Sequence, residues 1–222
     1  MLGDLWSFQG RYRTLHLTWI AFFLTFVVWF NLAPLATTVK ADLGLTVGQI
    51  RTVAICNVAL TIPARVLIGM LLDKFGPRIT YSSILVFSAI PCLLFASAQD
   101  FNQLVVARLL LSIVGAGFVI GIRMVAEWFP PKEIGLAEGI YGGWGNFGSA
   151  FSALTMVALA GFLSFSGGFE LPTGAVLNWR GAIALTGIVS AVYGFFYFFN
   201  VTDTPPGKTY QRPAKTAGLE VT

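Results

Sequence analysis

The sequence predicts an all-α integral membrane protein with six transmembrane helices. Its 222 residues are 56% hydrophobic and 11% charged, whereas charged residues make up about a quarter of a soluble domain. Apolar windows of about 20 residues, the length that crosses a bilayer, recur six times along the chain. The charged residues lie mostly between these windows. The net charge of +4 therefore indicates a partner in the lipid bilayer and no nucleic acid.

Each predicted span ends where the sequence supplies a helix breaker or a charged residue. We expect the spans at residues 15–37, 49–72, 80–98, 101–124, 136–164 and 179–201. The connections contain residues 41–44, Gly76-Pro77, Gln99-Asp100, Pro130-Pro131 and a Gly/Ser/Pro-rich stretch at 164–174. Residues 1–14 precede this six-helix bundle (15–201), and the Pro-, Lys- and Thr-rich residues 202–222 are predicted to form a mobile tail.

The distribution of Lys and Arg predicts the orientation, because cytoplasmic loops carry an excess of these residues. With a cytoplasmic N-terminus, the opposite side receives only Lys40, Arg51 and Arg180. The cytoplasmic side then receives Arg11, Arg13, Lys74, Arg78, Arg123, Lys132, Lys208, Arg212 and Lys215. We therefore expect a multi-pass protein of the inner (plasma) membrane with residues 1–14 and 202–222 in the cytoplasm.

Arg65 lies near the middle of the second predicted span, where an arginine costs roughly 2.5–3.5 kcal/mol on insertion scales. Asn57 and Thr61 precede it at intervals of four residues and Gly69 follows, so these residues share a face that we expect to turn inward. The working hypothesis is an anion site at Arg65. The alternatives are an arginine satisfied by helix carbonyls or a buried carboxylate, or one that snorkels to the surface. The absence of an obvious carboxylate in the flanking spans favours the anion site.

The connection between the second and third spans has a specific pattern, with Gly69, Asp73, Gly76 and Arg78 at fixed intervals. Gly69 permits a close helix approach, and Asp73 can cap or pair at the next helix start. Arg78 and Lys74 would hold the loop at the anionic leaflet. The pattern resembles the loop of the major facilitator superfamily, and the resemblance implies that these four spaced residues belong to a cytoplasmic gate.

The fourth span carries an arginine and an aromatic residue of interest, in a segment that also resembles the same superfamily. Arg108 lies near the outer end, so we expect it to pair or snorkel and not to bind substrate. Phe118 lies deeper in the membrane. Its ring could stack against a flat anion, with ordinary packing as the alternative.

The fifth span contains a glycine-rich stretch in which Gly139, Gly142, Gly143 and Asn146 share one helix face. Such a face lets another helix come close, and we assign Gly139 and Gly143 to this packing. Exposed glycine groups beside an asparagine amide can also contact an anion. The presence of Asn146 favours contact with an anion as the role of Asn146 and Gly142.

Several segments together resemble the nitrate/nitrite porter family of the major facilitator superfamily. They are the run from His16 in the first span, Ala64-Arg65 to Gly69, Glu127-Trp-Phe-Pro130, and Gly142-Gly-Trp-Gly-Asn146. The resemblance implies a nitrate or nitrite carrier in which Arg65, Gly142, Asn146 and Phe118 surround the anion. A planar anion suits a guanidinium fork with neutral donors and a ring face. No cofactor is required.

The chain corresponds to only one half of that family's fold, which has about twelve helices in two halves with the substrate between them. Its tail resembles the family's central cytoplasmic loop. Three alternatives follow: a non-transporting fragment, a subunit that assembles with a separate C-terminal six-helix half, or a symmetric homodimer. In the homodimer a second copy of Arg65 would supply the arginine that the other half supplies in the family.

Two functions remain open on the sequence alone. The first is secondary transport of nitrate or nitrite by alternating access, as exchange or linked to protons; the spans lack a convincing titratable residue, which favours exchange. The second is a non-transporting membrane module that pairs with or regulates a full-length porter. An enzyme is not expected, because no catalytic group can be assembled. Cys56, Cys92 and the single His16 form no recognisable metal site.

Overall fold

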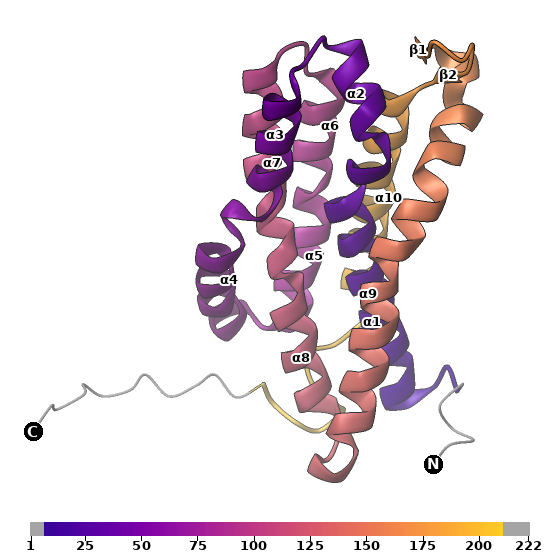
Figure 1. Cartoon of the computed structure of the whole chain (residues 1–222). Coiled ribbons are helices and arrows are strands. Elements are labelled where there is room, and N and C mark those ends of the chain that lie inside the picture. The colour runs from indigo at the N-terminus through magenta and orange to yellow at the C-terminus, as the bar shows by residue number, and fades with distance from the viewer. Residues whose placement is uncertain (1–6, 211–222) are drawn as a thin grey trace, which may run out of the picture.

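The protein is a bundle of membrane-crossing helices. A computed structural model describes residues 7–210, and six helices in it are long and apolar enough to cross a membrane. They are Gly10–Asp42, Val47–Phe75, Pro77–Ser97, Phe101–Trp128, Pro131–Ser166 and Trp179–Asn200. The six expected spans are confirmed, and most are longer than the apolar windows because the helices continue into polar residues beyond them. The N-terminal end of the first span and the C-terminal end of the last span lie at the same end of the bundle (Figure 1).

Five of the spans consist of more than one helical segment. The first contains α1 (Gly10–Phe30), η2 (Ala33–Leu35) and α2 (Ala36–Asp42), and the second α3 (Val47–Ala59) and α4 (Thr61–Phe75). The third contains α5 (Pro77–Phe87) and α6 (Ala89–Ser97), and the fourth α7 (Phe101–Ser112), η3 (Ile113–Ala116) and α8 (Gly117–Trp128). The fifth is α9 (Pro131–Phe162) with η4 (Leu163–Ser166), and the sixth is α10 (Trp179–Asn200).

Prolines account for the first three interruptions. A proline ring clashes with the carbonyl four residues earlier and lacks the N–H that would bond to it. The segments α1, α3 and α5 all end four residues before a proline, since Pro34, Pro63 and Pro91 follow the last residues of these helices at that distance. The sequence contained this signal, which the six apolar windows did not take into account.

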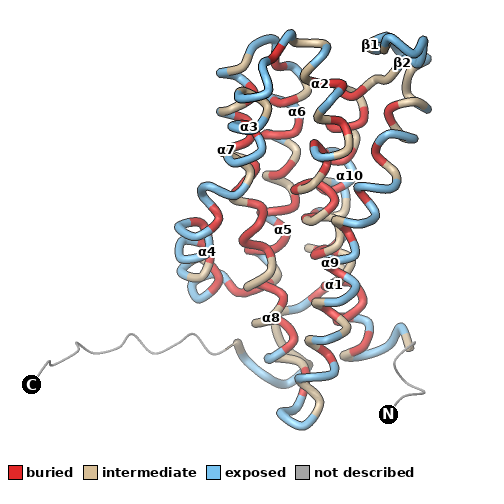
Figure 2. Tube along the Cα trace, in the orientation of Figure 1, coloured by how far each residue is buried: buried red, intermediate tan, exposed pale blue. Residues whose placement is uncertain are grey.

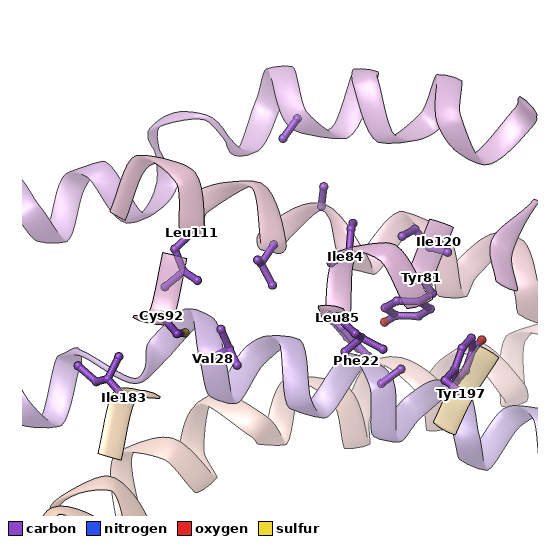
Figure 3. Close-up of a cluster of buried hydrophobic side chains, with 14 of the residues drawn as sticks. Phe22, Val28, Tyr81, Ile84, Leu85, Cys92, Leu111, Ile120, Ile183 and Tyr197 are labelled. Atoms are coloured by element: carbon purple, nitrogen blue, oxygen red, sulfur yellow. The ribbon is translucent and has the colours of Figure 1, made fainter. Parts of the chain in front are cut away.

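The core is built by contacts between spans that are distant in sequence. The helix α1 packs on α9, α10 packs on α5 and α6, and α3 packs on α7. Figure 3 shows side chains of the first, third, fourth and sixth spans meeting in one cluster: Phe22, Val28, Tyr81, Ile84, Leu85, Cys92, Leu111, Ile120, Ile183 and Tyr197. The same core extends to α4 through Ala64, Ile68 and Leu72.

Close packing of α1 and α9 depends on two glycines of the fifth span. A Cβ added at Gly145 would lie 1.7 Å from the ring of Phe22, and one added at Gly148 would lie 2.3 Å from the carbonyl oxygen of Phe23. A side chain at either position would collide with α1. These two helices therefore form a rigid pair.

Two spans are much less buried than the others. Only 22% of the most apolar stretch of the second and fifth spans is buried, against 56% in the fourth. Figure 2 shows long exposed stretches on α4 and α9, and Figure 1 shows these helices at opposite edges of the bundle with α1 and α8 between them. Their free sides face lipid or another protein.

The connection between the fifth and sixth spans contains structure that the sequence did not predict. Two short strands, β1 (Phe169–Glu170) and β2 (Val176–Leu177), pair in antiparallel register. The next residue, Asn178, bonds through its backbone N–H to the carbonyl of Ala160 at 2.9 Å and caps α10 by accepting a 2.7 Å bond from the N–H of Gly181. The all-α prediction holds for the spans, while this outer connection is a small β-hairpin.

The part of the predicted tail that the structure describes, residues 202–210, contacts the bundle. The mobility of this tail stays a prediction. Trp128 Nε1 donates a 3.2 Å bond to the carbonyl of Thr202, and the hydroxyl of Tyr210 donates a 3.1 Å bond to the carbonyl of Leu72. We call residues 201–210 the strap, because they cross the ends of the second, third and fourth spans. Residues 1–6 and 211–222, which include the rest of both predicted terminal segments, lie outside the described residues.

Candidate functional site

Arg65 lies on the exposed side of α4. The buried residues of this helix are Thr61, Ala64, Ile68 and Leu72, which form its packed face at intervals of three and four residues. Arg65 is next to that face but exposed, and within residues 7–210 it makes no hydrogen bond, ion pair or ring contact. Thr61 therefore lies on the packed face of α4, while Arg65 is exposed within this chain. The expectation that the face with Arg65 turns away from lipid stays a prediction.

Asn146 and Gly142 lie one turn apart on α9. Asn146 is exposed, and its side-chain N–H donates a 2.7 Å bond to the carbonyl of Gly142. This bond fixes the amide group along the helix and leaves its oxygen without a bond to any described residue. A Cβ added at Gly142 would meet nothing within 4 Å, so the backbone here is open to a ligand or to another helix.

Phe118 on α8 belongs to an aromatic group between α1 and α9. Its ring is half-buried and stacks on Tyr141 at 6.2 Å between centroids, and it lies 5.4 Å from the ring of Phe22. The hydroxyl of Tyr141 donates to the carbonyl of Phe118 at 3.1 Å. Phe118 is thus fixed by packing, with part of its ring still accessible.

The structure brings Phe118 next to the fifth span. It brings Arg65 into contact neither with Phe118 nor with the fifth span. The helix that carries Arg65 and the helix that carries Asn146 lie at opposite edges of the bundle (Figure 1). The predicted anion-binding residues therefore lie on separate helices, and no cavity in the described part of the chain encloses them together.

Gly139 and Gly143, which the sequence assigned to helix packing, pack against nothing within the described residues. An added Cβ at either would meet no atom within 4 Å. Together with Gly135 and the side chains of Trp144 and Phe147 they line a groove of about 530 Å³ on α9. Inside this chain, the close contacts are made by Gly145 and Gly148 instead.

The loop between the second and third spans is bonded to the strap. The N–H of Arg78 in the first turn of α5 donates a 2.7 Å bond to the carboxylate of Asp203 in the strap. Gly76 has a φ of +84°, and a Cβ there would lie 2.8 Å from that carboxylate. The carboxylate that accepts from the N–H of Arg78 thus belongs to Asp203 and not to Asp73, which is exposed. The prediction that Asp73 caps this N–H is therefore wrong.

The remaining predicted loop residues have simple surroundings. The guanidinium of Arg78 lies over the ring of Phe198 at 4.2 Å, and the ammonium of Lys74 lies over its neighbour Phe75 at 5.1 Å. A Cβ at Gly69 would meet nothing within 4 Å, so no described helix approaches closely there. A role for this loop in a gate stays a prediction.

Arg108 is the buried polar residue that sequence reasoning misjudged. It neither snorkels nor forms an ion pair with a described residue: its side chain is fully buried, and its Nη1 and Nη2 donate to the amide oxygens of Asn57 at 3.1 Å and Asn31 at 2.9 Å. Its guanidinium lies 4.5 Å from the ring centre of Phe95. Asparagines at these two positions were the available signal, because amide oxygens satisfy an arginine without a second charge.

Six membrane-crossing helices, two of which are largely exposed along their length, define a multi-pass integral membrane protein built as a half-bundle. The chain belongs to the Major Facilitator Superfamily, whose family model matches residues 18–221. The half-fold predicted from the sequence is thereby confirmed.

Curated relatives support the narrower resemblance as well. The chain is 63% identical to the nitrate/nitrite transporter NrtP of Picosynechococcus and 60% identical to NrtP of Nostoc punctiforme, over 100% of its own length and 44% and 43% of theirs. It is 31% identical to a probable nitrate/nitrite antiporter, NarK1, of Thermus thermophilus, across 89% of this chain and 44% of that protein. The chain thus spans less than half the length of these relatives.

Solved structures support the fold alone. A bacterial homologue of the human lysosomal transporter Spinster, in an inward-facing and unoccupied conformation, matches with a TM-score of 0.70 at 20% identity. The match covers 94% of this chain and 47% of the other. Here too the chain corresponds to about half of a larger bundle.

Proposed function

We propose that the chain forms one half of a nitrate/nitrite carrier in which Arg65 binds the anion. The observation that carries the proposal is the position of Arg65: it lies within a membrane span, on the exposed side of α4, without a partner among the described residues. A charged side chain inside a membrane span is costly and rare, so its presence favours a functional role. Two relatives of this chain are named nitrate/nitrite transporters, and these names supply the proposed substrate class.

The chemistry of the proposed site matches a planar monovalent oxyanion. A guanidinium group presents parallel N–H donors that suit two oxygens of one anion. Asn146 and the open backbone at Gly142 would supply neutral polar contacts from α9, and the accessible part of Phe118 a flat surface beside the anion. Because these groups lie on separate helices, a second half would have to enclose the anion.

The second half is proposed to be another six-helix bundle, either a C-terminal half or a second copy of this chain. The groove at Gly139 and Gly143 is a suitable surface for one of its helices, since small residues permit close approach of backbones in membranes. The second half would also contribute a second cation to the anion, which a single exposed arginine cannot surround.

The proposed orientation places the strap and the Gly69–Arg78 loop on the cytoplasmic side of the inner membrane. Arg11, Arg13, Lys74, Lys132 and Lys208 lie at this end of the spans, against Lys40, Arg51 and Arg180 at the other. The excess of cations favours the cytoplasm for the first end. Gly69, Asp73, Gly76 and Arg78 would then form part of a cytoplasmic gate.

Exchange of one anion for another is the proposed mode of transport for this half. The acidic residues closest to the membrane on the proposed cytoplasmic side, Glu127, Glu133 and Glu138, lie at the last turn of α8 or the first turns of α9. Glu127 and Glu133 form ion pairs with Arg123 and Arg11. No described carboxylate lies near the middle of a span to carry a proton.

The test is uptake of labelled nitrate into proteoliposomes that contain the purified chain alone, with Arg65→Ala as the control. Uptake by the parent that disappears in Arg65→Ala is expected if two copies assemble into a carrier. Uptake only after addition of a C-terminal half would identify that half as the required partner. Uptake that is equal in Arg65→Ala and the parent would contradict the proposed role of Arg65.

A further inference from the structure

The second and fourth spans are joined by polar contacts at the level where both are interrupted. Arg108 Nη1 donates to Asn57 Oδ1 at 3.1 Å. One turn further, Ser112 accepts a 3.3 Å bond from the N–H of Leu60 on its hydroxyl and another of 3.3 Å from the hydroxyl of Thr61 on its carbonyl. Asn57 and Thr61 are four residues apart, as are Arg108 and Ser112, so the contacts follow the facing sides of the two helices. We call these five residues the mid-span joint.

Arg108 fixes its side of the joint to the first span as well. Its Nη2 donates to Asn31 Oδ1 at 2.9 Å, and its Nε has no partner among the described residues. Burying a cation among neutral oxygens and one aromatic ring carries a large desolvation cost. A planar guanidinium can, however, bind two amides on two different helices at once, and that is its arrangement here.

Asn57 is held from a third direction by Trp29 of α1. Its side-chain N–H donates to the carbonyl of Trp29 at 2.9 Å, and the indole N–H of Trp29 donates to the carbonyl of Asn57 at 2.6 Å. A Cβ at Gly115 would lie 2.7 Å from the same indole, so η3 packs directly on it. The end of α3 is therefore fixed in position and in rotation by two other spans.

The helix α4, by contrast, has few polar contacts beyond the joint. Its first residue, Thr61, belongs to the joint, and at its far end the hydroxyl of Tyr210 donates to the carbonyl of Leu72. It stands at the edge of the bundle with its outer side exposed (Figures 1 and 2). Arg65 follows Thr61 by one helical turn. Besides the apolar packing of its buried face, the direction in which α4 leaves the joint thus contributes to where the guanidinium of Arg65 lies.

We propose that Asn57, Arg108 and Ser112 are positioning residues for Arg65. They set the direction of α4 at the interruption caused by Pro63, and Arg65 takes its place from that direction. The inference rests on the proposed function for its use in anion binding, but its geometric content concerns only α4 and can be tested without an anion.

The test measures distances between two spin labels by pulsed electron paramagnetic resonance. One label is placed at Met70→Cys on α4 and the other at Val106→Cys on α7, where the native side chains are 66% and 55% exposed. Cys56 is replaced by Ala, and Cys92, which is fully buried, stays unlabelled. The parent is expected to give one narrow distance distribution, and Ser112→Ala and Arg108→Met a broadened or shifted one.

The matched control is Ser190→Ala. Ser190 is also fully buried and accepts a 2.9 Å bond from Ser88 between the sixth and third spans, so its loss removes a hydroxyl of the same kind away from the joint. It should leave the Met70–Val106 distribution unchanged. A second label pair at Ile90→Cys on α6 and Val192→Cys on α10 should be unchanged in Ser112→Ala, which would show that the rest of the bundle is intact.

An unchanged Met70–Val106 distribution in Ser112→Ala overturns the proposal, whether or not the protein transports nitrate. Arg108→Met is the stronger change, and Ser112→Ala carries the test if that variant does not fold. In a preparation that binds nitrate, Ser112→Ala should weaken binding about three- to tenfold, and Ser190→Ala should not. A changed distribution with unchanged nitrate affinity would overturn the link to Arg65. Absence of nitrate binding by the parent, both alone and together with a C-terminal half, would overturn the proposed function and leave the distance result valid.

Discussion

Two arginines in membrane spans of this protein have opposite surroundings. Arg108 is fully buried and has the amide oxygens of Asn31 and Asn57 as its partners. Arg65 is exposed and has no partner among residues 7–210. Charge inside a membrane is tolerated either when neighbouring dipoles satisfy it or when a cavity admits water or an anion. Arg108 meets the first condition, and Arg65 depends on the second.

Replacing Arg65 by lysine should test whether the shape of the cation matters. An ammonium keeps the charge but loses the two parallel donors, so nitrate affinity in a binding-competent preparation should fall about 10- to 100-fold. The measurement is equilibrium binding of labelled nitrate. Arg51→Lys, at an exposed position on α3, serves as the control and should bind like the parent. Near-normal binding by Arg65→Lys would assign Arg65 a structural role.

The glycines of α9 should divide into two classes on substitution by alanine. Gly145→Ala places a methyl group 1.7 Å from the ring of Phe22 and should destabilise the chain by about 1–3 kcal/mol through overpacking. Gly139→Ala meets nothing within 4 Å and should be stable. Thermal unfolding in detergent, followed by circular dichroism, measures both. Equal melting temperatures for the two variants would contradict the tight α1–α9 contact.

At the level of whole elements, the strap is held to the bundle by an acidic cap. Asp203 receives the N–H of Arg78 at the start of α5, and Gly76 leaves room for the carboxylate. Burial raises the pKa of Asp203, and the nearby N–H and guanidinium of Arg78 oppose this change without cancelling it. The interaction therefore combines a favourable hydrogen bond with a costly desolvated charge.

Substitutions at Asp203 should separate these two contributions. Asp203→Ala removes the acceptor and should destabilise the docked strap by about 1 kcal/mol, as for other helix caps. Asp203→Asn keeps an acceptor oxygen and removes the charge, so the strap should dock at least as well as in the parent. A spin label at Lys208→Cys reports docking through its mobility. A more mobile label in Asp203→Asn than in Asp203→Ala would contradict this account.

The strap should also respond to pH in a defined direction. Because the pKa of Asp203 is higher when the strap is docked than when it is free, docking is favoured at low pH, where the carboxyl is protonated in both states. This contribution is lost as pH rises through the raised pKa of the docked state. The same label at Lys208→Cys should become more mobile over that rise. In Asp203→Asn the mobility should not follow pH in this window.

The elements that could be read from the sequence are those with a local signal. Six apolar windows predict six spans, and Pro34, Pro63 and Pro91 were sufficient to place three of the interruptions. The strap had no such signal, because the Asp203–Arg78 contact joins residues that are 125 positions apart. The hairpin at β1 and β2 was missed for a different reason: strands of two residues are too short to show an alternating pattern.

On the scale of the whole molecule, the residues of the candidate site lie on helices at opposite edges of the bundle (Figure 1). Residue types and spacing could select Arg65, Asn146 and Phe118, but they could not show that α4 and α9 are separated by other helices. Helical periodicity assigns residues to a face, and it does not say whether the partner of that face is in the same chain. For Gly139 and Gly143 the described residues contain no such partner.

A bulky side chain in the groove of α9 should therefore disturb assembly and not folding. Gly139→Leu enters open space in this chain, so its melting temperature should match that of the parent. Pairing with a second copy or with a C-terminal half should weaken, because the groove that admits a helix is filled. Single-molecule photobleaching of labelled chains in liposomes counts the copies. Ala158→Leu, at another exposed position of α9, is the control.

Two outcomes would contradict the assembly proposal in different ways. Single copies in both detergent and liposomes for the parent would remove the homodimer. Pairing that is equally strong in Gly139→Leu and Ala158→Leu would leave a pair but exclude the groove as its contact.

The interruption at Leu60 also has a consequence for isotope exchange. A continuous helix across a bilayer protects its central amides best, since they are furthest from water. In the second span the amide of Leu60 is bonded to a serine hydroxyl, and three residues later Pro63 has no amide hydrogen. If water reaches the open side of α4, deuterium should enter this span from its middle, ahead of the helical turns on either side.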